Sequence, residues 1–175
     1  MECKGVLHGF LVGIDNGGKV PGDERGYPEG YRGLMRYVFW PLEPESGPEA
    51  EALVDEGWMK YEWGTLAVRD LEFVRRYRDE CERQGLGPVV LAIGNDEMGP
   101  EAPKGVKEWR EIGFECASDG DMLVSYLWAN GAWDAEGLGS NGLFETQEQA
   151  AGFAQKIGEG EYGPAAAVKI MRVEL

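Results

Sequence analysis

The sequence contains few of the residues on which most catalytic and metal sites depend. Its 175 residues include one histidine, His8, so a Ser-His-Asp or Cys-His catalytic site, or a histidine-based metal site, would have to use that side chain. The nucleophile motif G-x-S-x-G is absent. His8 lies inside a predicted strand, where we interpret it as structural. We therefore predict a protein that is not an enzyme and that has no cofactor and no metal.

Cysteine is also scarce. Cys3, Cys81 and Cys116 are odd in number, lie far apart and form no C-x-x-C pair, so they indicate neither a disulfide framework nor a zinc site. No apolar run approaches the length of a membrane span, and the N-terminal residues lack the apolar core and small-residue cleavage site of a signal peptide. We expect reduced structural thiols, a cytoplasmic location and no membrane partner.

Positive charge is in short supply, because 17 Lys and Arg residues stand against 32 Asp and Glu residues, a net charge of −15. The excess is uneven. Residues 41–66 carry seven acids and one base, and residues 111–161 carry ten acids and one base. Such a surface repels nucleic acid and anionic lipid and attracts basic proteins. We predict a basic protein as the partner, with no direct nucleic-acid binding; solubility alone is the alternative explanation.

Two glycine-rich stretches resemble nucleotide-binding loops. The segment GIDNGGKV, residues 13–20, has the spacing of a phosphate-binding loop, but Val20 stands where the motif requires a hydroxyl, and Pro21 prevents a helix from starting there. Asn and Gly tolerate positive φ angles, so we interpret this stretch as a turn after a strand. The segment GLGSNG, residues 137–142, follows no predicted strand and is interpreted as a loop.

Periodicity and capping signals predict a single α+β domain over residues 1–175, with a mixed or antiparallel sheet and about three to four helices. Apolar alternation or short apolar runs predict strands at 6–14, 34–43, 58–68, 87–94, 107–117 and 165–175. Helical spacing and caps predict helices at 46–57, 69–85, 119–129 and 144–158.

Three of these helices show clear boundary residues. Pro48 occupies a helix-start position and Gly57 a stop position in the first helix. Gly85 is placed to end the helix at 69–85. In the last helix, Thr146 and Gln149 have the spacing of a capping box, in which each side chain bonds the backbone of the other residue.

The many carboxylates leave open a paired Asp/Glu hydrolase. Asp119 with Asp121, or Asp134 with Glu136, could supply such a pair or bind Mg²⁺ or Ca²⁺. The segment ASDGDMLVS nevertheless lacks the further acids and the closing Glu of a calcium loop. A carboxylate-based, metal-dependent hydrolase is therefore kept as an alternative function.

Binding of a partner is better supported by the sequence. Trp133 lies in a glycine-rich segment beside Asp134 and Glu136, and an aromatic side chain surrounded by acids is typical of an interface that captures a basic protein. The predicted contact residues are Asp119, Asp121, Trp133, Asp134 and Glu136. The alternative acidic face comprises Glu49, Glu51 and Asp55.

The segment IGFECASDGDMLVSYLWANG, residues 112–131, resembles immunity proteins of bacterial polymorphic toxin systems. The matching residues are Gly113, Phe114, Ala117, Asp119, Leu123, Ser125, Leu127, Asn130 and Gly131. The resemblance implies a non-enzymatic protein that binds and neutralises a cognate toxin, and it assigns no specific binding residue. A phage or mobile-element protein that mimics the charge of nucleic acid and inhibits a host defence protein is the second possibility.

Overall fold

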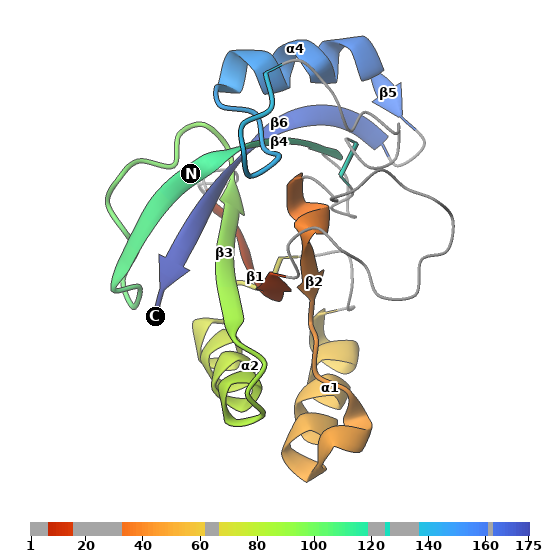
Figure 1. The fold of residues 1–175 in the computed structure, drawn as a ribbon, viewed down its shortest axis with the longest axis vertical. Helices are drawn as coiled ribbons and strands as arrows, with labels where there is room; N and C mark the ends of the chain where they lie inside the picture. The colour runs from red at the N-terminus through yellow and green to blue at the C-terminus, as the bar shows by residue number, and fades with distance from the viewer. Residues whose placement is uncertain (1–6, 16–32, 62–66, 119–124, 127–136, 161–162) are drawn as a thin grey trace.

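An antiparallel sheet forms the centre of the protein, with its strands in the order β2-β1-β3-β6-β4 (Figure 1). The computed structural model describes residues 7–15, 33–61, 67–118, 125–126, 137–160 and 163–175. The strands are β1 (Leu7–Asp15), β2 (Tyr37–Phe39), β3 (Pro88–Gly94), β4 (Glu108–Ser118), β5 (Glu159–Gly160) and β6 (Gly163–Glu174). The α-helices in these ranges are α1 (Pro48–Tyr61), α2 (Leu71–Arg83) and α4 (Gln147–Ile157), with short 3-10 helices η1 (Gly33–Arg36) and η2 (Pro44–Ser46). The predicted α+β class is confirmed.

Successive side chains along a strand point to opposite faces of the sheet, so the apolar residues are divided between the two faces. In β1, Phe10 and Val12 pack with α1 and α2, whereas Leu11 between them faces the opposite side. Leu34 of η1 and Leu143 cover that opposite side. Both faces of the central strands are therefore buried, which explains why residues 87–94 form a continuous apolar run and why a core strand was correctly predicted there.

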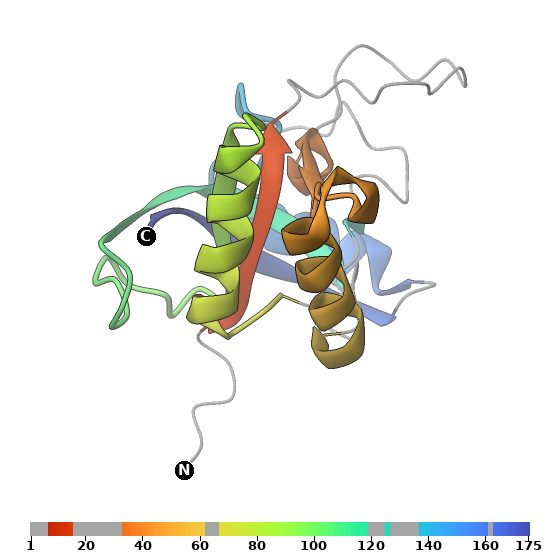
Figure 2. The same ribbon diagram turned by 90° about the horizontal axis from the view of Figure 1, so that it is seen from below.

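Helix α2 covers β1 and β3 from one side (Figure 2). Its N-cap is Asp70, whose carboxylate accepts hydrogen bonds from the backbone N–H groups of Glu72 and Phe73 at 3.0 and 3.2 Å. Gly85, just after the helix, has a φ of 75°, which is the left-handed conformation that glycine adopts at helix C-termini. The helix predicted over 69–85 is confirmed.

Helix α4 lies at the opposite end of the molecule from α1 and α2 and packs on β4 and β6 (Figure 1). Thr146 and Gln149 form the predicted capping box, each side chain bonding the other residue's backbone N–H. In the part of the chain that the structure describes, none of the helices is long and apolar enough to cross a membrane.

Helix α1 is longer than predicted. Gly57 does not end it but is buried within it, and the helix continues to Tyr61. The Tyr61 hydroxyl donates a hydrogen bond to Asp70 at 2.9 Å, and its ring lies 4.8 Å from the ring of Phe73. These tertiary contacts offset the roughly 1 kcal/mol by which glycine disfavours a helix relative to alanine. The strand predicted over 58–68 was therefore wrong for residues 58–61; residues 62–66 lie outside the described residues, and Val68 forms an isolated β-bridge with Phe10 of β1.

The strand predicted over 34–43 is confirmed only in its centre. Residues 37–39 form β2, which pairs with β1, but residues 33–36 form η1 and the chain turns sharply at Trp40. Trp40 has a φ of 54°, in the left-handed region that non-glycine residues rarely occupy. The strand therefore ends before Pro41, and the residues after it pass over α1 and α2.

Candidate functional site

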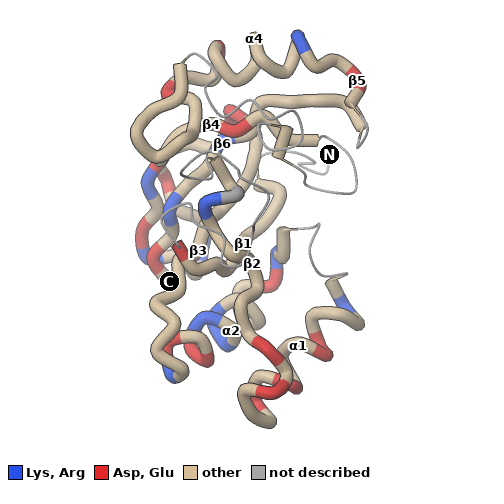
Figure 3. The backbone as a smooth tube through the Cα atoms, turned by 45° about the vertical axis from the view of Figure 1, so that its right-hand side comes forward, with Lys and Arg blue, Asp and Glu red and all other residues tan. Residues whose placement is uncertain are grey.

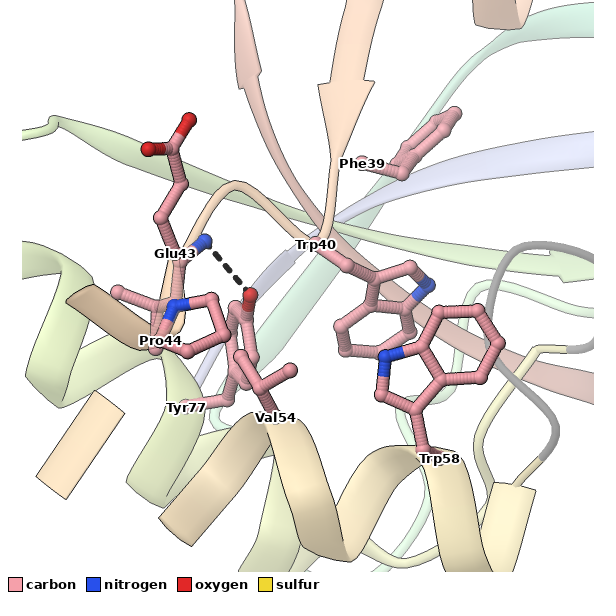
Figure 4. Close-up of a pocket in the computed structure, with 8 residues that line it drawn as sticks. Phe39, Trp40, Glu43, Pro44, Val54, Trp58 and Tyr77 are labelled. Atoms are coloured by element: carbon pink, nitrogen blue, oxygen red, sulfur yellow. Dashed lines mark hydrogen bonds between the residues drawn. The ribbon is translucent and has the colours of Figure 1, made fainter. Parts of the chain in front are cut away.

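A pocket of about 350 Å³ opens where the chain leaves β2 and crosses α1 and α2 (Figure 4). Three separate parts of the chain form its walls: residues 39–44, helix α1 and helix α2. The lining residues are Phe39, Trp40, Leu42, Glu43, Pro44, Val54, Trp58 and Tyr77. Four of these side chains are aromatic and three are aliphatic or proline, so the pocket presents apolar and aromatic surface with a single carboxylate.

The left-handed backbone at Trp40 places one aromatic wall of the pocket. The Trp40 N–H donates a hydrogen bond to the carbonyl of Val12 at 2.8 Å, which ties this turn to β1. Its indole packs edge-to-face on Tyr77, with 5.2 Å between ring centroids, and lies 6.3 Å from the ring of Phe73. A left-handed non-glycine residue costs on the order of 1–3 kcal/mol, and such strain is often found at functional positions. Here, packing and the hydrogen bond hold Trp40 in place.

Tyr77 of α2 forms the buried end of the pocket. Its side chain is fully buried, and its hydroxyl oxygen accepts a hydrogen bond from the backbone N–H of Leu42 at 2.7 Å (Figure 4). Burial raises the pKa of Tyr77 well above its ordinary value, so the phenol is neutral at physiological pH. This hydrogen bond fixes residues 40–44 to α2 and keeps this end of the pocket in one geometry.

One exposed apolar side chain, that of Trp58, belongs to the pocket lining. Trp58 of α1 is 63% exposed and points toward Trp40 (Figure 4). Met59 is 80% exposed, and Val38 on the edge strand β2 is 40% exposed. Among the described residues these are the large hydrophobic side chains that remain most accessible. An accessible tryptophan in a pocket lining is a candidate binding residue, because tryptophan is enriched among the residues that contribute most to binding.

Acidic residues are concentrated on α1 and on the segment just before it, which together line the pocket (Figure 3). The α1 acidic face, as we define it, consists of Glu43, Glu45, Glu49, Glu51 and Asp55, all of which are exposed. Within the described ranges none of these five forms an ion pair. Glu56 differs, because it is paired with Lys60 at 2.9 Å and with Arg76 at 2.8 Å, and these cations lower its pKa. Glu49 interacts electrostatically with Arg83 of α2. Among the described residues, the negative charge without a nearby cation is therefore that of Glu43, Glu45, Glu51 and Asp55.

The contact residues predicted first from the sequence lie outside the described residues: Asp119, Asp121, Trp133, Asp134 and Glu136. Most of the helix predicted over 119–129 also lies outside them. Both stay predictions. The alternative residues Glu49, Glu51 and Asp55 all lie on α1, where Glu51 and Asp55 share one face and Glu49 lies on another, toward Arg83 of α2. Trp40 and Trp58 were not predicted as contact residues, because both fell within predicted strands. The seven acids in residues 41–66 were the available signal for this region.

One of the ten acids in residues 111–161 contributes nothing to the surface. Glu115 of β4 is completely buried. Its carboxylate accepts hydrogen bonds from the backbone N–H groups of Leu34 at 2.9 Å and Cys116 at 3.1 Å, and it also bonds the Ser125 side chain. Burial raises the pKa of Glu115 to about 8, so at neutral pH most of this group is protonated. Its role is to hold η1 and Ser125 against β4.

The remaining reactive residue types lie in structural positions. Cys81 and Cys116 are free thiols that are fully buried, and burial raises the pKa of each to about 12, which suppresses the reactive thiolate. His8 is a half-buried residue of β1 whose carbonyl accepts a hydrogen bond from Arg69. Within the described ranges, no group of three His, Cys, Asp or Glu side chains is arranged to hold a metal ion.

The fold and site define a small α+β domain with an aromatic pocket beside an acidic helix. No protein-family model, curated protein or solved structure matches the chain. The resemblance of residues 112–131 to immunity proteins therefore stays a prediction, and functional inference depends on the geometry of the pocket and the α1 acidic face.

Proposed function

We propose that this is a small, acidic, non-enzymatic protein that binds and neutralises a basic partner protein, specifically a cognate toxin. The observation that carries the proposal is the α1 acidic face, a group of exposed carboxylates on the segments that line a pocket with an exposed tryptophan, with Glu43 in the lining itself. An aromatic side chain close to several acids is typical of an interface that captures a basic protein.

The two components of the site have different physical roles. Unpaired carboxylates attract a basic partner and raise the association rate, while their effect weakens as salt increases. Buried aromatic anchors slow dissociation, because their contacts are lost only when the partner leaves the pocket. A toxin that acts on nucleic acid carries a basic cleft, and an acidic protein with an aromatic anchor is suited to occupy that cleft.

The test compares two sets of charge-neutralising substitutions. Glu49→Gln, Glu51→Gln and Asp55→Asn remove three charges from the α1 acidic face. The matched control, Glu145→Gln, Glu148→Gln and Glu159→Gln, removes three exposed charges around α4 at the opposite end of the molecule (Figure 1). Both variants have the same net charge. A third variant, Asp134→Asn with Glu136→Gln, tests the contact residues predicted from the sequence.

Each immobilised variant is used to retain proteins from the source cell at low and at high salt, and a retained basic protein is then purified for binding kinetics. We expect retention at low salt, an association rate reduced about tenfold by the α1 substitutions, and little change in the α4 control. Co-expression of the retained protein should arrest growth, and the chain should restore it. Failure to retain any basic protein at low salt would refute the function, whereas equal effects of the α1 and α4 variants would refute the site.

A further inference from the structure

We propose that the pocket receives one arginine side chain of the basic partner, with its guanidinium group stacked on the aromatic surface that Trp40 and Trp58 contribute to the pocket. This inference rests on the proposed function and specifies how the partner is recognised. It assigns the aromatic residues a chemical role distinct from that of the nearby carboxylates.

The geometry of the pocket matches a flat cationic group on an apolar stem. Trp40 and Trp58 project from different segments, and both indoles line the pocket, with Trp58 directed toward Trp40 (Figure 4). Tryptophan binds cations over its ring face more strongly than the other aromatic residues do. Arginine suits such a site because its guanidinium is planar and weakly hydrated and stacks on aromatic rings. Leu42, Pro44 and Val54 line the same pocket and supply apolar contacts for the methylene groups of the stem.

The charges around the pocket favour a cation over an apolar anchor. Glu43 is an exposed residue of the lining, and no Lys or Arg belongs to the lining among the residues that the structure describes. An arginine would gain binding free energy both from contact with the aromatic rings and from attraction to the nearby carboxylates. A leucine or phenylalanine would gain binding free energy only from the burial of apolar surface. A second copy of this chain is disfavoured, because two α1 acidic faces would then lie opposite each other at a net charge of −15 each.

Part of the pocket is already organised for binding. Trp40 is fixed by its hydrogen bond to Val12 and by packing on Tyr77, and Tyr77 is tied to Leu42. A wall that needs no reordering reduces the entropy lost when the ligand binds. Trp58 is the accessible wall, so its removal changes the pocket without removing a core residue.

A double-mutant cycle tests the proposal with defined peptides. The peptides have the form Lys-Gly-Gly-X-Gly-Gly-Lys with blocked ends, where X is arginine, citrulline, lysine or leucine; citrulline has the shape of arginine without its charge. Each peptide is titrated into the wild type, Trp58→Ala and the control Met59→Ala, and binding is followed by the indole N–H signals in NMR spectra. Met59 is the adjacent exposed apolar residue of α1 and is not part of the pocket lining.

We expect the arginine peptide to bind the wild type about three- to thirtyfold more tightly than the citrulline peptide. In Trp58→Ala this ratio of affinities should fall to the value that long-range attraction by the carboxylates produces alone. In Met59→Ala it should stay at the wild-type value. Both variants keep every carboxylate, so a difference between them reports the loss of the indole. Circular dichroism verifies that all variants are folded.

Several outcomes would overturn the arginine site. If the ratio of the arginine-peptide affinity to the citrulline-peptide affinity is the same in wild type and Trp58→Ala, the tryptophan site is refuted. The proposed binding of a basic partner would remain. The same conclusion follows if the lysine peptide matches the arginine peptide or if the leucine peptide binds as tightly. If the wild type forms a dimer and Trp58→Ala does not, a second copy of the chain is the occupant of the pocket. If none of the peptides binds the wild type, the proposal is also refuted.

Discussion

The buried carboxyl group of Glu115 makes stability depend on pH in a way that one substitution should remove. Burial raises its pKa from 4.5 in the unfolded chain to about 8 in the folded protein. Between these values the folded state holds a proton that the unfolded state has released. Stability is therefore greatest below about pH 4.5 for this group, declines as pH rises, and levels off above about pH 8.

The change in the free energy of unfolding with pH follows from the shift in the pKa of Glu115. Each pKa unit corresponds to about 1.4 kcal/mol, so the full shift amounts to on the order of 4–5 kcal/mol, a large part of a typical unfolding free energy of about 5–15 kcal/mol. Glu115→Gln does not titrate. Its amide group must face one of the backbone N–H donors of Leu34 and Cys116, so we expect the variant to be less stable than wild type near pH 5 by about 1–3 kcal/mol.

The two stability curves should therefore cross at or below neutral pH, with the variant the more stable protein at pH 8. Urea unfolding followed by tryptophan fluorescence at pH 5, 6, 7, 8 and 9 measures both curves. Glu108→Gln, at an exposed position on the same strand, is the control and should keep the wild-type slope. A difference between wild type and Glu115→Gln that stays constant from pH 5 to pH 8 would contradict the reasoning.

Substitutions at three further positions test the structure by urea unfolding. Tyr77→Phe leaves the buried N–H of Leu42 without its acceptor and should reduce stability by about 1–3 kcal/mol; no loss would mean that this hydrogen bond does not organise the pocket. Thr146→Ala removes the N-cap of α4 and should cost about 1 kcal/mol, while Thr146→Ser should restore most of it. Gly33→Ala should cost at least about 1–3 kcal/mol, because φ is 64° and the new methyl group would overlap the Glu115 carboxyl group; wild-type stability would contradict this packing.

The elements predicted correctly from the sequence have local signals. Thr146 and Gln149 lie three residues apart, and their reciprocal bonds form whenever a helix starts there. Helix α2 likewise has its periodic apolar face and a glycine just after its end, at Gly85. Such signals depend on neighbours along the chain, so little tertiary information is needed to interpret them.

The elements predicted incorrectly depend on distant contacts. Gly57 has the local properties of a helix stop, but Tyr61 bonds Asp70 and packs on Phe73, and these contacts extend α1 beyond the glycine. Trp40 has the composition of a strand residue, yet its backbone is left-handed because β1 and α2 hold it there. In both cases tertiary packing overrides local preference.

The candidate site was predictable in its charge and not in its shape. Glu49, Glu51 and Asp55 were recognised as an acidic face because they lie close together in the sequence. The pocket could not be recognised in the same way, since Trp40, Trp58 and Tyr77 come from three segments that meet only in the folded chain.

By itself, the sequence determined the α+β class, the boundaries of its best-capped helices and the excess of negative charge, because composition, periodicity and capping are local properties. The tertiary structure alone decided which carboxylates are exposed. It buried Glu115 inside the molecule and left the α1 acidic face open beside the aromatic pocket. The physical reason is that burial depends on what packs over a residue, and the segments that cover Glu115 or line the pocket are brought together only by folding.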